Sequence, residues 1–111
     1  MSYNKLKSLM ANVEAIETAV KIQAQGRTAT ESDKETLSLY SGFGGIKEVL
    51  NMGTDKPLAD NLTEPMNRLQ EALQTYVNGN EERYRTLIDS IKASVLTAFY
   101  TPKFLIDAVA R

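Results

Sequence analysis

The sequence predicts an all-α protein, a compact bundle of about five or six helices with a short glycine-rich connection. Apolar residues recur at steps of three and four along most of the chain, and capping residues precede and follow the periodic segments. No segment shows convincing alternation of apolar and polar residues, the pattern that indicates strands. A chain of 111 residues is long enough for a single modest core. We therefore expect one helical domain spanning residues 1–111.

The first expected helix carries the clearest periodic pattern. Its apolar stripe consists of Leu6, Leu9, Val13, Ile16 and Val20. Gly26 predicts the end of this helix, because glycine adopts a positive φ without a Cβ penalty. The stripe has two interpretations, one face of a bundle helix or the seam of a coiled-coil dimer. We favour the bundle face, since a coiled coil needs at least about three heptads and the pattern barely lasts that long.

A second, shorter helix is expected between Thr30 and about Tyr40. Thr30 is a favourable N-cap, and the acidic residues Glu31 and Asp33 suit the first turn of a helix. The three glycines within Ser41–Gly45 break this helix, and we expect Phe43 to enter the core there.

The chain then predicts one or two helical turns and a connecting loop. Residues 46–51 favour the turns, and residues 52–57 favour the loop. A long helix is expected next, with Thr63 as N-cap and Pro65 in its first turn. Its apolar face consists of Met66, Leu69, Leu73, Tyr76 and Val77.

Asn78-Gly79-Asn80 ends this helix and predicts a helical hairpin. The apolar stripe of the second arm consists of Tyr84, Leu87, Ile88, Ile91, Val95 and Phe99. Residues 94–101 contain several side chains that favour strands, but the stripe continues into them, so we expect a helix to about Ala98. Thr101 and Pro102 then begin a last helix, Lys103 to Ala110.

Composition excludes several kinds of chemistry. The chain has no Cys and no His, which removes thiolate nucleophiles, Ser-His-Asp triads and zinc sites of the usual kind. The pairs Glu14/Glu17, Glu31/Glu35 and Glu81/Glu82 are interpreted as solvated helix faces, so no metal site and no catalytic residue is expected. A net charge of −1 without a basic cluster argues against nucleic-acid binding by this segment alone.

No apolar run approaches the roughly 20 residues that span a bilayer. The N-terminus also lacks the apolar core of a signal peptide. We therefore expect a cytoplasmic protein without a membrane partner.

Two short motifs remain. Leu39-Tyr40-Ser41-Gly42-Phe43-Gly44-Gly45 superficially resembles the cofactor loop of cytosine-ring DNA methyltransferases, but those enzymes need a cysteine nucleophile that this chain lacks. It also lacks the Gly-Lys-Ser/Thr ending of a P-loop. Phe99-Tyr100-Thr101-Pro102 is explained by helix capping alone if Thr101 is the N-cap and Pro102 the first helical residue.

Taken together and in this order, the two motifs resemble the N-terminal region of mobile-element DNA methylase/helicase proteins. The matching stretches are Tyr40-Ser41-Gly42-Phe43-Gly44-Gly45-Ile46-Lys47-Glu48-Val49-Leu50 and Ser94-Val95-Leu96-Thr97-Ala98-Phe99-Tyr100-Thr101-Pro102. In that family a helical leader precedes an adenine N-6 DNA methyltransferase domain that depends on S-adenosylmethionine. The resemblance implies a cofactor-binding role for Phe99, Tyr100, Thr101 and Pro102. Lys103 stands where relatives often have a second proline.

The resemblance also implies what this segment cannot do by itself. The family's Asn-Pro-Pro-aromatic catalytic turn is absent from these 111 residues, so we expect an inactive leader of a longer enzyme. DNA and S-adenosylmethionine would then be bound only in the longer protein, and residues 102–110 would begin the methyltransferase domain. Phe104, Leu105 and Val109 are expected to form an incomplete apolar face through which the isolated chain dimerises. The alternative is a self-contained helical protein-interaction module without a catalytic role.

Overall fold

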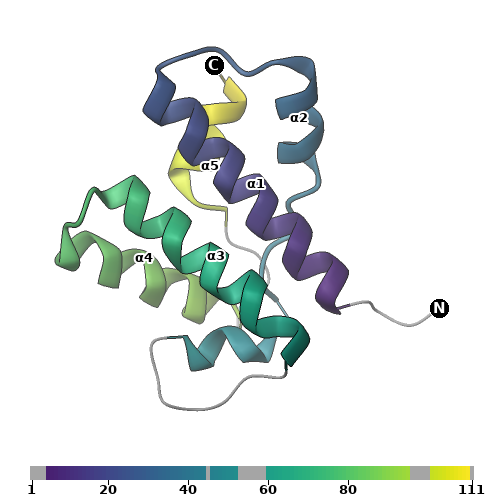
Figure 1. Ribbon diagram of the computed structural model, residues 1–111, viewed down its shortest axis with the longest axis vertical. Helices are drawn as coiled ribbons and strands as arrows, with labels where there is room; N and C mark the ends of the chain where they lie inside the picture. The colour runs from purple at the N-terminus through teal and green to yellow at the C-terminus, as the bar shows by residue number, and fades with distance from the viewer. Residues whose placement is uncertain (1–4, 45, 53–59, 96–100, 111) are drawn as a thin grey trace.

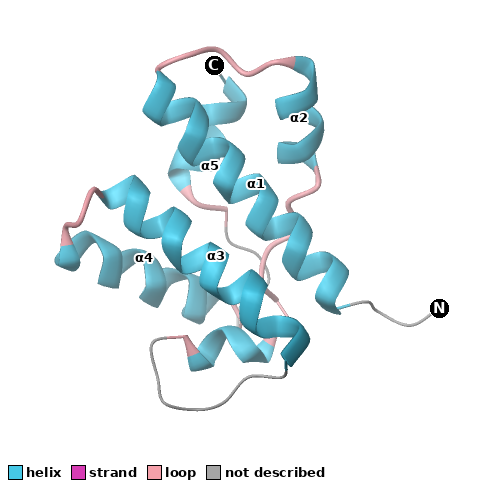
Figure 2. Ribbon diagram, in the orientation of Figure 1, coloured by secondary structure: helices cyan, strands magenta, loops and turns pink. Residues whose placement is uncertain are grey.

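The order of helices along the chain follows the sequence-based expectation. The computed structural model describes residues 5–44, 46–52, 60–95 and 101–110, and these contain five α-helices, one 3₁₀ helix and no strand (Figures 1 and 2). The elements are α1 (Lys5–Gln25), α2 (Glu31–Ser38), η1 (Lys47–Asn51), α3 (Asp60–Val77), α4 (Glu81–Ser94) and α5 (Lys103–Ala110). The all-α prediction is confirmed.

Helix α1 crosses the middle of the molecule and organises the rest. Helix α2 lies on one side of α1 and the antiparallel hairpin of α3 and α4 on the other, with α3 in contact with α1 (Figure 1). Helix α5 packs against both α1 and α2. The 3₁₀ helix η1 packs against α4. The radius of gyration is 13.5 Å, close to the roughly 13 Å expected of a compact chain of this length.

Helix α1 is buried on more sides than its apolar stripe indicates. Its buried residues are Leu9, Asn12, Val13, Ala15, Ile16, Ala19, Val20 and Ile22. The small side chains Ala15 and Ala19 extend the buried surface beyond the stripe, so that helices can cover α1 from several directions. The stripe is therefore the face of a bundle helix, covered by helices of the same chain.

The ends of α1 and α3 are closed by the same hydrogen-bond pattern. After α1, the N–H groups of Gly26 and Arg27 donate to the carbonyl oxygens of Gln23 (3.2 Å) and Ile22 (3.3 Å), with Gly26 at φ 61°. This is a Schellman motif, which satisfies carbonyls that the last helical turn leaves free. The expected role of Gly26 is confirmed.

After α3, an asparagine occupies the left-handed position of the Schellman motif. Asn78 has φ 53°, and its N–H donates to the carbonyl of Thr75 (3.2 Å), while the N–H of Gly79 donates to that of Gln74 (3.4 Å). Asparagine tolerates this conformation better than most residues other than glycine. Asn80 then caps α4 by accepting the N–H of Arg83 (3.0 Å), as expected.

Helix α3 begins earlier than expected. Thr63 and Pro65 lie inside the helix, which starts at Asp60, so the prediction of Thr63 as N-cap is wrong. The earlier start brings Leu62 into line with Met66 and Leu69, and all three side chains are buried. The free energy gained by burying Leu62 explains why the helix begins before the capping signal at Thr63.

The end of α4 also differs from the expectation. The helix ends at Ser94, with Val95 as its C-cap, whereas a helix to about Ala98 was expected. Residues 96–98 and the expected stripe residue Phe99 lie outside the described residues.

Helix α5 buries the side chains that were expected to be exposed. Phe104 and Leu105 are only 2% and 4% exposed, because α5 folds back onto α1 and α2. The expectation that these residues form an open dimerisation face is wrong, and the Val109 side chain lies outside the described structure. On α5 the exposed large hydrophobic residue among those described is Ile106.

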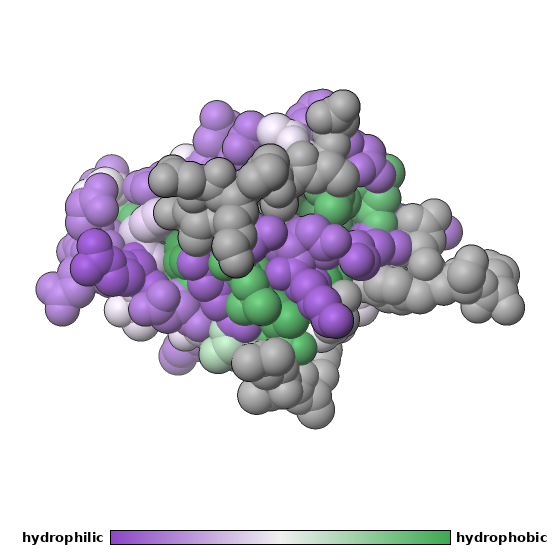
Figure 3. Space-filling model, turned by 90° about the horizontal axis from the view of Figure 1, so that it is seen from below, coloured by the Kyte–Doolittle hydropathy of each residue, from purple (hydrophilic) through white to green (hydrophobic). Residues whose placement is uncertain are grey.

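One face of the molecule shows how polar and apolar side chains are distributed on its surface. Viewed from the side on which η1 lies, the described residues are mainly hydrophilic, with some hydrophobic side chains near the centre of the face (Figure 3). Among the helices that the structure describes, none combines the length and apolar character needed to cross a membrane.

Candidate functional site

The glycine-rich motif is attached to α1 by a buried asparagine. The Asn12 side chain is fully buried, and its Nδ2 donates to the carbonyl oxygen of Gly42 (2.5 Å). Its Oδ1 accepts the backbone N–H of Ser41 (2.8 Å) and the Ser41 hydroxyl (3.4 Å). One amide side chain thus holds both a donor and an acceptor of the loop backbone, which fixes the loop relative to α1.

The loop conformation explains why glycine and phenylalanine stand next to one another. Gly42 is buried and has φ 86°, a conformation that is unfavourable for residues with a Cβ atom. The turn at Gly42 directs Phe43 inward, where its side chain is fully buried and its ring meets that of Tyr40 edge to face at 6.1 Å. The expected placement of Phe43 in the core is confirmed.

The residues with an expected cofactor role lie just before α5. Phe99 and Tyr100 are outside the described residues. Thr101 is half-buried and Pro102 is buried. The carbonyl of Pro102 accepts the N–H groups of Leu105 (3.0 Å) and Ile106 (3.3 Å), so Pro102, rather than Thr101, occupies the N-cap position of α5.

A stack of three side chains connects α5 to the α3–α4 hairpin. The rings of Phe104 and Tyr76 are stacked at 4.3 Å with an interplanar angle of 28°. The guanidinium carbon of Arg83 lies 5.6 Å from the centroid of the Tyr76 ring. These side chains border a groove of about 300 Å³ whose other walls include Leu87 and Lys103. The groove opens at the first turn of α5, directly after Pro102.

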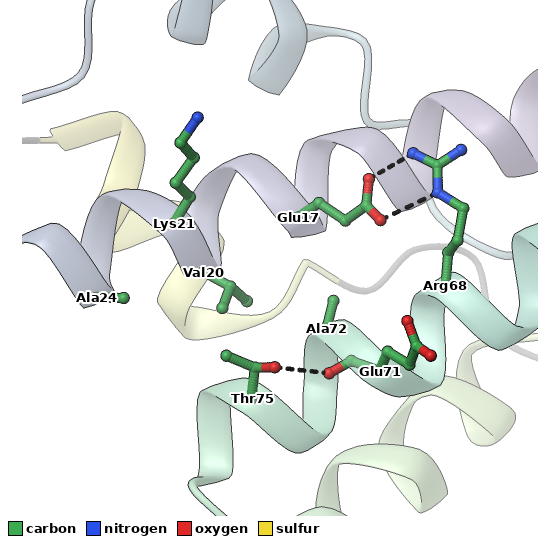
Figure 4. Close-up of a pocket in the computed structure, with 8 residues that line it drawn as sticks. All are labelled: Glu17, Val20, Lys21, Ala24, Arg68, Glu71, Ala72 and Thr75. Atoms are coloured by element: carbon green, nitrogen blue, oxygen red, sulfur yellow. Dashed lines mark hydrogen bonds and ion pairs between the residues drawn. The ribbon is translucent and has the colours of Figure 1, made fainter.

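A second groove, of about 330 Å³, runs between α1 and α3 (Figure 4). Val20 and Ala72 approach each other across it, and the ion pair of Glu17 and Arg68 closes one end. Arg68 Nε and Nη2 donate to the two carboxylate oxygens of Glu17 at 3.1 Å and 2.6 Å. This hydrogen bonding raises the pKa of Arg68. The paired charges join the two helices, so a structural role explains them.

The other charged contacts are also structural. Lys5 Nζ donates to Glu48 Oε2 at 3.0 Å and joins the start of α1 to η1. Burial raises the pKa of the Glu48 carboxyl, but the hydrogen bond from Lys5 and neighbouring positive charge outweigh this effect, and the pKa is lowered. Among the described residues, no group of three or more acidic side chains is placed to hold a metal ion.

Sequence reasoning missed two features of this site. The apolar periodicity of the first helix does not mark Asn12. A polar residue in an otherwise apolar stretch of helix is nevertheless a recognisable sign of a buried hydrogen bond. Glu17 was interpreted as part of a solvated face, yet it is half-buried and paired with Arg68. The partner of an ion pair 51 residues away is not visible from helical spacing alone.

Tyr40, Tyr76 and Tyr84 are half-buried and pack against the core. Comparison with protein-family models, with curated proteins and with solved structures gave no match.

Proposed function

We propose that this chain is the N-terminal helical leader of an S-adenosylmethionine-dependent adenine N-6 DNA methyltransferase. In this proposal the leader is a scaffold that holds part of the cofactor wall and is inactive alone. The following catalytic domain binds DNA, and the enzyme works in the cytoplasm. The bound cofactor supplies the methyl group, and the leader contributes only to its position.

One observation carries the proposal: α1 binds the first motif of the family resemblance and packs against the helix that directly follows the second motif. Asn12 binds the backbone of Ser41 and Gly42, and α5, which begins directly after Pro102, packs against the same helix. Two segments separated by about half of the chain are therefore attached to one rigid element. Such an arrangement suits a scaffold that has to present a short segment in a defined place.

The described residues of the second motif suit a cofactor wall. Pro102 is buried and precedes a docked helix, so its backbone is held in place. Thr101 is half-buried and carries a hydroxyl group that can donate and accept hydrogen bonds. A polar group beside a fixed backbone fits the amino-acid end of S-adenosylmethionine, which carries both a carboxylate and an ammonium group.

The first test is the reading frame of the gene after codon 111. The proposal expects a strand ending in a glycine-rich loop, followed by Asn-Pro-Pro-Phe or Asn-Pro-Pro-Tyr. A reading frame without these two motifs contradicts the proposal as a whole.

The second test concerns the cofactor wall. S-adenosylmethionine binding to the complete polypeptide is measured by calorimetry for the wild type, for Thr101→Ala combined with Pro102→Ala, and for Thr75→Ala on α3 as the control. We expect weaker binding for the double variant only. Equal affinities for the wild type and the double variant would exclude the cofactor-wall role and leave the family assignment standing.

The alternative, a self-contained interaction module, needs a continuous exposed apolar face. Among the described residues, the exposed large hydrophobic side chains are Leu39, Leu50 and Ile106, which belong to three separate parts of the chain. No contact between residues that the structure describes favours this alternative over the leader.

A further inference from the structure

The groove between α3, α4 and α5 combines an apolar wall with two cationic side chains. Phe104 and Leu87 supply apolar surface, while Arg83 and Lys103 supply positive charge from different helices. This combination is typical of small-molecule sites, in which a mostly apolar surface carries a few convergent polar groups.

Arg83 is placed where it can meet an anion. Its guanidinium carbon lies 5.6 Å from the centroid of the Tyr76 ring, and Phe104 stacks on the same ring. A cation–π contact uses the charge of the guanidinium and none of its N–H groups, which remain available for hydrogen bonds. Among the described residues, no carboxylate forms an ion pair with Arg83.

Lys103 provides the second cation. Its Nζ lies 3.2 Å from Asp107 Oδ2, one helical turn along α5, and the Lys103 side chain is 87% exposed. Exposed pairs at this spacing are weak. An incoming carboxylate can therefore compete with Asp107 for the ammonium group.

The remaining charge in the groove decides which anion fits. Glu82, next to Arg83, also lines the groove, and Asp107 offsets part of the charge of Lys103. The lining residues Arg83, Lys103 and Glu82 sum to a formal charge of +1, and Asp107 reduces the effect of Lys103 further, which favours a singly charged ligand over a phosphate dianion. The guanidinium fork matches the two oxygens of a carboxylate.

We propose that this groove binds a small organic carboxylate, with the carboxylate between Arg83 and Lys103 and the apolar body against Leu87 and Phe104. The volume of about 300 Å³ is at the lower end for ligand pockets and suits a compact molecule. Of the described cofactor-wall residues, neither Thr101 nor Pro102 lines this groove, so the two proposals can be tested separately.

The probe for the test is 3-phenylpropionate, titrated into the ¹⁵N-labelled chain and followed by the amide signals of Tyr76, Arg83, Leu87 and Phe104. We expect saturable shifts at these positions. The neutral 3-phenylpropanamide should bind more weakly, and so should the Arg83→Gln and Lys103→Gln variants. Each loss should be about threefold to fivefold, the value typical of an exposed charge pair.

Arg85→Gln is the matched control. Arg85 is on the same helix but lines a different groove, so its substitution should leave the affinity unchanged. The proposal is overturned if no saturable shift appears, if the amide binds as well as the acid, or if Arg83→Gln binds like the wild type. Inorganic phosphate shifting the same signals at equal or lower concentration would also overturn it, because the apolar wall would then have no role.

Discussion

A buried asparagine at position 12 determines how the glycine-rich loop is held. Both ends of its amide are used, one by the Gly42 carbonyl and the other by the Ser41 N–H. Truncation of this side chain would leave a backbone donor and acceptor without their partner in a buried setting. The cost of such unsatisfied groups exceeds the modest net gain from forming an ordinary hydrogen bond.

We therefore expect Asn12→Ala to lower the free energy of unfolding by about 2–3 kcal/mol. Urea denaturation followed by circular dichroism measures the change. Asn67→Ala, an exposed position on α3, is the control and should change stability by no more than about 0.5 kcal/mol. Similar losses for the two variants would show that the amide does not stabilise the loop.

Asp33 illustrates how one carboxylate can serve two partners at a helix start. It accepts the N–H of Thr30 at 2.9 Å, while its own N–H donates to the Thr30 hydroxyl at 3.1 Å, which completes a capping box. Asp33 also forms an ion pair with Arg27 at 2.5 Å. The Arg27 hydrogen bond, followed by that of Thr30, lowers the pKa of Asp33 from 3.8 to about 2.

This lowered pKa predicts a specific pH dependence. The folded state holds the ionised form more tightly than the unfolded state, so the stabilisation is complete above the ordinary pKa of 3.8 and is lost as the pH falls through about 2. Asp33→Asn should therefore lower the melting temperature most above pH 5, with a difference from the wild type that shrinks towards pH 2.

Glu31→Gln, in the same first turn, is the control for this series, and its difference from the wild type should vary less over that range. Melting curves recorded by circular dichroism at each pH provide the comparison. A constant difference between wild type and Asp33→Asn across the range would contradict the expected linkage.

At the level of elements, capping signals located some helix ends better than others. The positions of Gly26, Thr30 and Asn80 were predictable, because each supplies a local group or conformation that the adjoining turn needs. The start of α3 was not, since Thr63 and Pro65 form a capping signal that the burial of Leu62 overrides. Local chemistry determines a boundary only where packing does not favour a longer helix.

Helix α5 is short, so we expect its position to depend on few side chains. Phe104 is buried and stacks on Tyr76, whereas Ile106 is 54% exposed. Phe104→Ala should lower the free energy of unfolding by about 3–5 kcal/mol, the usual cost of removing a large buried aromatic side chain. Ile106→Ala, the control, should cost less than about 1 kcal/mol.

Chemical denaturation gives both values, and amide exchange of α5 identifies the helix affected. Rapid exchange confined to α5 in Phe104→Ala would show that this side chain attaches the helix to the bundle. A loss as small as that of Ile106→Ala would contradict the packing described for Phe104.

For the molecule as a whole, the fold class was predictable, but the arrangement of helices was not. Helical periodicity identifies which residues of α1 are apolar, yet it cannot say that Ala15 and Ala19 also face neighbouring helices. Periodicity does not show how helices pack, and for this reason the prediction for Phe104 and Leu105 was wrong. Their apolar face is covered because α5 packs against α1. Pairings such as Glu17 with Arg68, and the loop contacts of Asn12, depend on this arrangement and could not be derived from local sequence.

The central position of α1 predicts cooperative unfolding. Because α1 contacts α2, α3 and α5, none of these helices can separate from it without exposing core side chains. We expect amide signals from α4 and α5 to disappear at the same urea concentration, together with the far-ultraviolet circular dichroism signal. Loss of the α5 signals well before those of α4 would show two separately stable halves instead.

Helix α1 is also the first of the described helices along the chain, so it is synthesised before the helices that cover it. Gln25 leaves the ribosome 78 residues before Lys103, and at about 5–20 residues per second α1 waits roughly 4–16 s for the start of α5. Helices α2 and α3 emerge during this interval and can cover part of α1, but the surface that contacts α5 stays without its native partner. Exposed apolar surface of this kind promotes aggregation of a newly made chain, even though α5 hides it in the finished protein.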